Sequence, residues 1–111
     1  MRARDDRVFL DDIVEAAANL ARFVDGRTFE DFRNDLLFRS AVLYQVIVIG
    51  EAANRISRNF RSLHPEIPWR ELADLRHTAI HDYFGTDWLF VWKAATDRIP
   101  KLISRIELLR H

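Results

Sequence analysis

The residues best suited to chemistry lie in one short stretch, Arg76 to Tyr83, which reads RHTAIHDY. Its side chains admit three interpretations, and the first is a metal site. His77 and His81 are four positions apart, so they share a face of a helix and could bind a metal ion, with Asp82 or His64 as further ligands. The stretch has no glutamate between the histidines, as the zinc-protease pattern HExxH requires. The metal interpretation therefore rests on spacing alone.

The second interpretation is purely structural. The carbonyl end of a helix favours cations, so histidines near that end can simply satisfy the helix dipole. Arg76 and Asp82 would then be surface charges, and Tyr83 would pack against Phe84.

The third interpretation is cleavage of RNA without a metal ion. The 2′-hydroxyl beside each phosphate is already a nucleophile, so a protein need only move protons and stabilise charge on the phosphoryl oxygens. A histidine exchanges protons near neutral pH, and an arginine fork can hold two phosphate oxygens. We assign these roles to His81, as general acid or base, and to Arg76. The two lie about 140° apart on an ideal helix, so a shared cleft must wrap around the helix end or be completed by a partner chain.

The overall charge indicates that any RNA binding is local. The chain has 17 basic residues (Lys and Arg) and 17 acidic residues (Asp and Glu). A strongly basic domain would instead indicate a nucleic-acid partner. Arg55, Arg58 and Arg61 recur three apart and could follow an RNA backbone, or could only complement a helix dipole. The chain has no cysteine, and its charged N-terminus lacks the apolar region of a secretory signal. We therefore expect a cytoplasmic protein.

The elements that must position these side chains are all predicted to be helices of a single domain, residues 1–111. The first carries an apolar stripe that ends before Gly26, a C-terminal cap. Thr28 and Asp31 match a capping box and open a short helical segment. A long helix is then expected over residues 35–60. The stripe of the first helix comprises Leu10, Ile13, Val14, Ala17, Leu20, Ala21 and Val24.

The middle of the long helix, AVLYQVIVIG at residues 41–50, is apolar on nearly every side. The longest apolar stretch, Ala41 to Ile49 with Gln45 inside it, is less than half of the length that a bilayer requires, so no membrane span is expected. A helix of this kind must be covered on two sides, which is more than so small a domain offers. We predict that Val42, Val46, Ile49 or their neighbours pack against a second copy of the chain. The alternative is a buried central helix in a monomer.

Two further helices complete the prediction. Pro68 suits the first turn of a helix that stops near Gly85, and Thr86 or Asp87 can cap the next one. Pro100 interrupts that last helix and should bend it without ending it, because the apolar stripe continues in phase. The expected fold is an all-α, antiparallel up-and-down bundle of four main helices and a short one. The last stripe comprises Trp88, Val91, Trp92, Ala95, Ile99, Leu102, Ile103, Ile106 and Leu109.

The same motifs carry a family resemblance. Arg76 through His81 fits the HEPN signature, an arginine followed by a histidine four to six residues later, and His81-Asp82-Tyr83 fits the His-x-Tyr extension of the HepT-like branch. The segments VIGEAANRIS (48–57) and HPEIPWRE (64–71) resemble two other landmarks of that branch. The chain is therefore similar to HepT-like HEPN proteins almost from end to end. It departs from their pattern at His77, where the family commonly has asparagine.

The resemblance implies a metal-independent endoribonuclease without a cofactor, acting on tRNA or mRNA as the toxin of a prokaryotic toxin–antitoxin pair. It implies a homodimer with the Arg-His motifs near the interface. The antitoxin would be a minimal nucleotidyltransferase that transfers AMP from ATP to Tyr83, so that bulk and charge beside Arg76 block RNA entry. His77 would support the site, and Glu51 and Asn54 would either line the same cleft or form a buried hydrogen-bonded pair. The alternative function is a noncatalytic helical module that docks a nucleotidyltransferase or presents a substrate to it.

Overall fold

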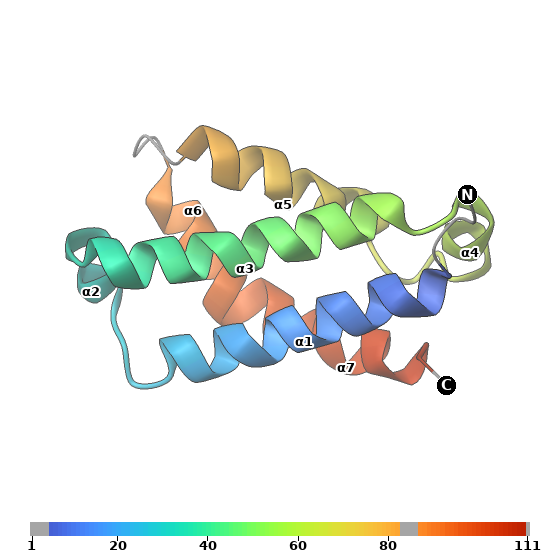
Figure 1. Cartoon of the computed structure of the whole chain (residues 1–111), viewed down its shortest axis with the longest axis horizontal. Helices are drawn as coiled ribbons and strands as arrows, with labels where there is room; N and C mark the ends of the chain where they lie inside the picture. The colour runs from blue at the N-terminus through green and yellow to red at the C-terminus, as the bar shows by residue number, and fades with distance from the viewer. Residues whose placement is uncertain (1–4, 83–86, 111) are drawn as a thin grey trace.

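The helices form an antiparallel bundle, and the all-α architecture is confirmed. The computed structural model describes residues 5–82 and 87–110, apart from the side chain of Asp82. Helices α1, α3 and α5 lie side by side across one face, and the segment from α6 to α7 crosses behind them (Figure 1). No strand occurs in these described ranges, and they contain two short helices where one was expected. The elements are α1 (Asp6–Val24), α2 (Phe29–Asn34), α3 (Leu36–Arg55), α4 (Arg58–Leu63), α5 (Trp69–Asp82), α6 (Trp88–Lys93), a π-helical segment (Ala94–Arg98) and α7 (Ile99–Leu108).

Local sequence signals set several of the helix ends as predicted. Gly26 follows α1 with a φ of 71°, a conformation that glycine adopts without steric cost. Thr28 and Asp31 form a reciprocal capping box at α2: the Asp31 amide donates to Thr28 Oγ1 at 3.1 Å, and the Thr28 amide donates to Asp31 Oδ2 at 2.9 Å. The Thr28 amide is the main reason that the pKa of Asp31 lies below its usual range. The Asp87 side chain caps α6, whereas Thr86 lies outside the described residues.

The prediction of one long helix over residues 35–60 is wrong. Helix α3 ends at Arg55, the backbone of Ile56 is extended, and Ser57 caps the separate helix α4. Both the amide and the hydroxyl of Ser57 donate to the carboxylate of Asp6, each at 2.7 Å. The Ser57 cap on the Phe60 amide is a local signal for this break, whereas the bonds to Asp6, 51 positions earlier in the chain, could not be predicted from it.

The central helix α3 buries the residues that we expected at an interface. Val42, Val46 and Ile49 are 0%, 1% and 0% exposed within a single chain. They cannot contact a second copy, so that assignment is wrong and the buried-helix alternative holds for these three. The large apolar side chains that α3 does expose include Leu37 and Tyr44, at 82% and 64%.

Helix α3 is also more apolar as a whole than its longest uninterrupted run indicated. An 18-residue window of this 20-residue helix has a mean hydropathy of 1.5, so by length and composition alone the helix could cross a membrane. The argument from the uninterrupted run therefore excluded a span too readily. The core explains the same composition, because α3 packs against both α1 and α5 and buries its Val42–Val46–Ile49 face.

Pro100 does not end the C-terminal helix. Its ring removes an N–H donor, and the chain accommodates this with the π-helical segment, in which the Ile99 amide bonds to the carbonyl of Ala94. The apolar stripe stays in phase on either side, so Val91, Ile99 and Ile106 are all buried in the same core. The long, interrupted helix expected from the sequence is confirmed.

An ion pair ties α5 to this C-terminal segment. The Arg98 guanidinium donates to both Glu71 carboxylate oxygens, at 2.6 and 2.7 Å, and these bonds lower the pKa of Glu71. A carboxyl group whose pKa is lowered by folding stabilises the protein above the unfolded-state pKa, and that contribution is lost as the pH falls through the folded-state value.

We expect Glu71→Gln to lower the free energy of unfolding at neutral pH by about 1 kcal/mol or less, because both side chains are nearly half exposed. The two unfolding curves should converge in acid, where the native carboxyl group is protonated as well. Thermal unfolding measured across the acid range checks this. A difference between the variants that stayed constant down to the lowest pH would contradict the role of the charge.

Candidate active site

The position of Arg76 is set by a close crossing of α3 and α5. A Cβ atom added to Gly50 would lie 2.5 Å from the Arg76 amide nitrogen and 2.8 Å from the Arg76 Cβ. The two helices therefore meet backbone to backbone, which only a residue without a side chain permits. Sequence reasoning missed this role of Gly50. The available signal was an isolated glycine inside an otherwise helical pattern, which often marks a close approach.

Glu51, the next residue of α3, holds two arginines. Its Oε2 lies 2.8 Å from Arg76 Nε, and its Oε1 lies 2.9 Å from Arg55 Nε. We call Arg55 and Arg76, joined by Glu51, the arginine pair. All three side chains are more than a third exposed, so these contacts add little to stability, about 0–1 kcal/mol each. Their main effect is to orient the two guanidinium groups.

The arginine pair keeps hydrogen-bonding capacity for a ligand. Each guanidinium has five N–H donors, and Glu51 engages each through Nε. Within the described part of the chain, neither has a second carboxylate partner. One carboxylate between two guanidiniums leaves a net positive charge. Such a group suits an anion with several oxygens, such as a phosphate.

The two histidines of the motif contact each other on the exposed surface of α5. The ring centroids of His77 and His81 lie 4.2 Å apart, with the rings inclined at 62°. The prediction that they share a face is confirmed. Since His77 directly follows Arg76, the imidazoles continue along α5 from the arginine pair. Arg76 supplies donors for a phosphate, and His77, the next residue, contacts His81, so groups that can exchange protons near neutral pH follow it along the helix.

The metal interpretation gains no further ligand. Among residues 5–82 and 87–110, no cluster of three or more potential ligand side chains occurs. His64, a proposed ligand, lies before the start of α5, whereas His81 lies near the end of that helix. The ring centroids of His64 and Phe60 are 4.6 Å apart, and His64 Nδ1 is 3.5 Å from a Glu66 carboxylate oxygen. That proposal is wrong for His64. The side chain of Asp82 lies outside the described residues.

The three arginines spaced three apart do not form one surface. Arg55 belongs to the arginine pair, whereas Arg58 lies on the separate helix α4. Arg61 turns back to cap α3: its guanidinium donates to the carbonyl groups of Ala53 at 2.8 Å and of Ile56 at 3.2 Å. For Arg61 the helix-dipole alternative is confirmed.

Asn54 does not join Glu51. Its side chain is exposed at the end of α3, its carbonyl accepts a bond from Arg61 at 2.8 Å, and Glu51 bonds to arginines instead. The expectation of a buried Glu51–Asn54 pair is therefore wrong. Tyr83, the proposed modification site, lies outside the described residues, as do Phe84 and Gly85.

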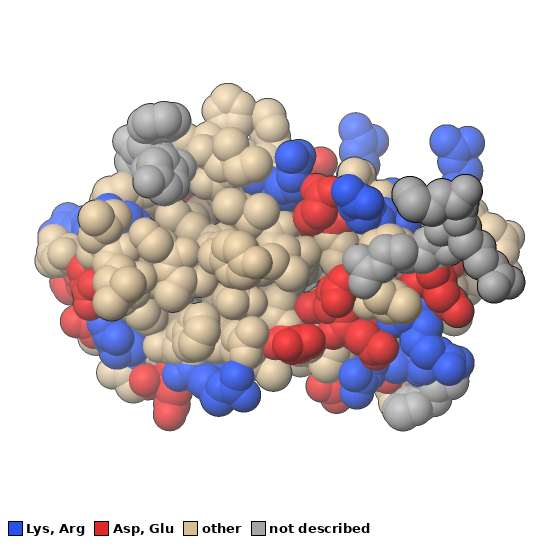
Figure 2. All heavy atoms as spheres, viewed as in Figure 1, with Lys and Arg blue, Asp and Glu red and all other residues tan. Residues whose placement is uncertain are grey.

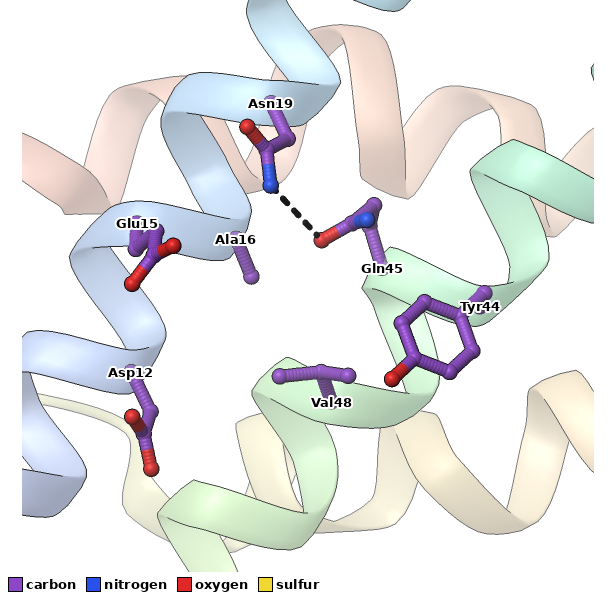
Figure 3. A pocket seen from close by; sticks show the side chains of 7 residues that line it. All are labelled: Asp12, Glu15, Ala16, Asn19, Tyr44, Gln45 and Val48. Atoms are coloured by element: carbon purple, nitrogen blue, oxygen red, sulfur yellow. Dashed lines mark hydrogen bonds between the residues drawn. The ribbon is translucent and has the colours of Figure 1, made fainter.

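A pocket between α1 and α3 presents a different chemistry (Figure 3). Its volume is about 200 Å³, and carboxylates of Asp12 and Glu15 line the α1 side. Across it, Asn19 Nδ2 donates to Gln45 Oε1 at 3.3 Å. Carboxylates repel phosphate, so this pocket is unsuited to an RNA backbone. Charged atoms gather over the C-terminal half of α3, whereas uncharged atoms cover its N-terminal half (Figure 2).

Comparison with known proteins gives consistent matches over almost the whole chain. The family model described as "Ribonuclease HepT-like" matches residues 13–109. A protein of Thermococcus cleftensis named as a HepT ribonuclease is 42% identical over 107 residues, which cover 96% of this chain and 97% of that protein. A Methanocaldococcus jannaschii protein named as an RNase is 36% identical over 109 residues, 98% of this chain and 100% of that protein. No solved structure matches the chain.

Proposed function

The chain belongs to the HepT-like ribonuclease family, and we propose that it is a metal-independent endoribonuclease. One observation carries the proposal: Arg76, positioned by the Gly50 crossing and by Glu51, immediately precedes His77 on the exposed surface of α5, and the His77 ring contacts His81. A phosphate-binding group beside groups that exchange protons is what RNA cleavage requires, because the substrate brings its own nucleophile.

In the proposed reaction, Arg76 binds the phosphoryl oxygens of the bond to be cut. The 2′-oxygen loses its proton to a base and attacks phosphorus, and the 5′-oxygen leaves with a proton from an acid. The products are a 2′,3′-cyclic phosphate and a 5′-hydroxyl end. His81 exchanges one of these protons, and His77, in contact with it, supports the second exchange or holds the phosphate. The guanidinium stabilises the charge that builds up on phosphorus-bound oxygens in the transition state.

The biological role that we propose is that of a toxin paired with a minimal nucleotidyltransferase. AMP transferred to Tyr83 would place a phosphate and a nucleoside two positions from His81. The added negative charge would compete for Arg76, and the added bulk would obstruct RNA. The family membership and the His-Asp-Tyr sequence support this role.

The proposal is tested with purified protein and with growing cells. In the presence of a chelator, we expect tRNA or mRNA to be cut to products with cyclic phosphate ends. Expression should arrest growth, and the neighbouring nucleotidyltransferase should relieve the arrest. Intact mass after incubation with that partner and ATP should rise by one or more AMP units, and Tyr83→Phe should abolish the increase.

A noncatalytic binding module is the second candidate, because His77 replaces the usual asparagine. It predicts binding to the nucleotidyltransferase without RNA cleavage and without growth arrest. Intact RNA after incubation with the protein alone would therefore favour this candidate.

We also propose a homodimer that covers the N-terminal half of α3. Leu37 and Tyr44 are exposed there, and Ile80 on the neighbouring helix α5 is 45% exposed. Uncharged atoms cover this half of the face (Figure 2). An apolar surface of this kind next to the motif residues would bring the two sites of a dimer to the interface.

Sedimentation should therefore show a dimer at micromolar concentration, and Leu37→Asp with Tyr44→Asp should convert it to a folded monomer. The control is Leu108→Asp, since Leu108 is 75% exposed but lies on α7. A wild-type chain that sediments as a monomer, or a control variant that dissociates equally, would contradict the assigned surface.

A further inference from the structure

A polar pocket of about 270 Å³ lies where α3 ends and α4 begins, and the proposed reaction does not use it. We call this cavity the α4 pocket, and helix α4 itself lies beyond the C-terminal end of α3 (Figure 1). The pocket between α1 and α3 holds two carboxylates, whereas the lining of the α4 pocket holds none. Asp6 is acidic and bonds to Ser57 at the start of α4, but it does not line the pocket. The lining residues are Asn54, Ile56, Arg58 and Arg61.

Arg61 is held at the pocket by three hydrogen bonds, and it keeps donors for a ligand. Its Nε donates to the Ile56 carbonyl at 3.2 Å, and its Nη2 donates to the Ala53 and Asn54 carbonyls, each at 2.8 Å. A guanidinium has five N–H donors, so the two on Nη1 stay available. Carbonyl groups carry no net charge, so the full positive charge of Arg61 also remains. The same side chain can therefore cap α3 and bind an anion.

Arg58 adds a second positive charge to the α4 pocket. It lies three positions before Arg61 on α4, and side chains three apart lie on the same face of a helix. Among the residues that the structure describes, no carboxylate pairs with either guanidinium. The Asn54 side chain is exposed at the same pocket and can donate N–H groups. Two cations and an amide around one cavity suit a phosphate, which offers several acceptor oxygens.

The α4 pocket continues the face of α3 that meets Arg76. Asn54 is four positions after Gly50, against which Arg76 packs, so Asn54 and Gly50 share a face of α3. Four residues correspond to about 6 Å along a helix axis. The pocket and the motif arginine can therefore bind different phosphates of one strand.

We propose that the α4 pocket binds a second backbone phosphate of the RNA, away from the bond that is cut. This inference rests on the proposed ribonuclease function. Arg58 and Arg61 supply the charge, Arg61 through its unused Nη1, and Asn54 adds a donor. Phosphate contacts position a strand without reading its sequence. The pocket therefore fixes the register of the strand relative to Arg76.

The first experiment measures binding of a 2′-O-methyl RNA, which cannot be cut because its 2′-oxygen is blocked. Arg58→Gln should weaken binding about tenfold and reduce the slope of log affinity against log salt by about 0.7, the value for one phosphate contact on a single strand. The matched control is Arg105→Gln, which removes the same charge from an exposed position on α7. Equal losses in the two variants would show that the arginines act only as general surface charge, and would overturn the proposal.

A second pair of variants changes an amide to a carboxylate of nearly the same shape. Asn54→Asp places a negative charge in the pocket, so binding of the same RNA should weaken about tenfold. Asn59→Asp places that charge at an exposed position of α4 that does not line the pocket, and its effect should be much smaller. Thermal unfolding checks the fold of each variant. Equal effects of the two changes would overturn the proposal, even where Arg58→Gln does not fold.

The two phosphate sites are separated by combining variants. Losses at independent sites add as free energies. Arg58→Gln combined with Arg76→Ala should therefore weaken RNA binding by about the product of the two single losses. A double variant that binds no more weakly than Arg76→Ala alone would place both arginines on one phosphate, and the second site would be wrong.

Three outcomes separate the RNA assignment from other ligands and from the proposed function. If inorganic phosphate or ATP binds through Arg58 while RNA binding does not depend on it, the pocket takes a small phosphate ligand and the RNA assignment is wrong. If wild type cuts RNA but Arg58→Gln and Asn54→Asp bind RNA as their controls do, the pocket is wrong and the ribonuclease stands. If wild type cuts no RNA but the binding differences appear as described, the pocket stands and the ribonuclease is wrong.

Discussion

Replacing His81 with alanine is expected to lower the rate of RNA cleavage by about 10²- to 10⁴-fold, the usual contribution of a general acid or base. The fold should be unaffected, because His81 is exposed near the end of α5 and its ring contacts His77 rather than the core. The cleavage rate of one labelled RNA, measured together with thermal unfolding, checks both statements.

Two further variants show whether the loss is specific. Arg76→Ala should cost about 10²- to 10³-fold, as expected for loss of a group that stabilises transition-state charge. His77→Ala should reduce cleavage less than His81→Ala does, because the motif assigns the proton exchange to His81. Full activity of His81→Ala, or equal loss in the two histidine variants, would contradict this assignment of roles.

Gly50→Ala is expected to damage stability and activity together. The new Cβ would meet backbone atoms of Arg76 at 2.5 and 3.0 Å, and these cannot rotate away as the end of a flexible side chain can. Overpacking costs about 1–3 kcal/mol, which exceeds the roughly 1 kcal/mol that alanine gains as a better helix former. Separation of α3 from α5 would also move Arg76 relative to Glu51. Unfolding by denaturant and the cleavage rate per folded molecule measure the two effects.

Gly26→Ala is the matched control, because this position requires glycine for its backbone conformation and not for a close helix contact. Its φ of 71° disfavours any side chain, although nothing lies within 4 Å of an added Cβ. The strain should lower the free energy of unfolding by about 1–2 kcal/mol. The position of Arg76 at the Gly50 crossing should not change. If Gly50→Ala lost stability but retained full activity per folded molecule, as Gly26→Ala should, the crossing would not position Arg76.

The sequence predicted the features that depend on neighbouring residues. Apolar side chains recurring every three or four positions predicted the bundle, since that spacing alone determines which face of a helix is apolar. The caps at Thr28 and Asp87 were also predictable, because a capping side chain bonds to an amide two or three positions away. The shared face of His77 and His81 followed from the helical period.

What depends on distant residues was decided only by the tertiary structure. The break after Arg55 is held by two bonds from Ser57 to Asp6, 51 positions away. Which apolar residues of α3 are buried depends on where α1 and α5 pack, so Val42, Val46 and Ile49 proved to be core, whereas Tyr44 of the same stretch is exposed.

The sequence identified the motif RHTAIHDY as a candidate site, but it did not show which residues surround the motif. Helical periodicity gives the direction of a side chain around its own axis and nothing about the helix that crosses it. The crossing at Gly50 places Arg76 against Glu51, and Glu51 in turn selects Arg55 from three similarly spaced arginines. The sequence therefore determined the residue types of the motif, whereas the contact between two helices determined the grouping of Arg76 with Glu51 and Arg55.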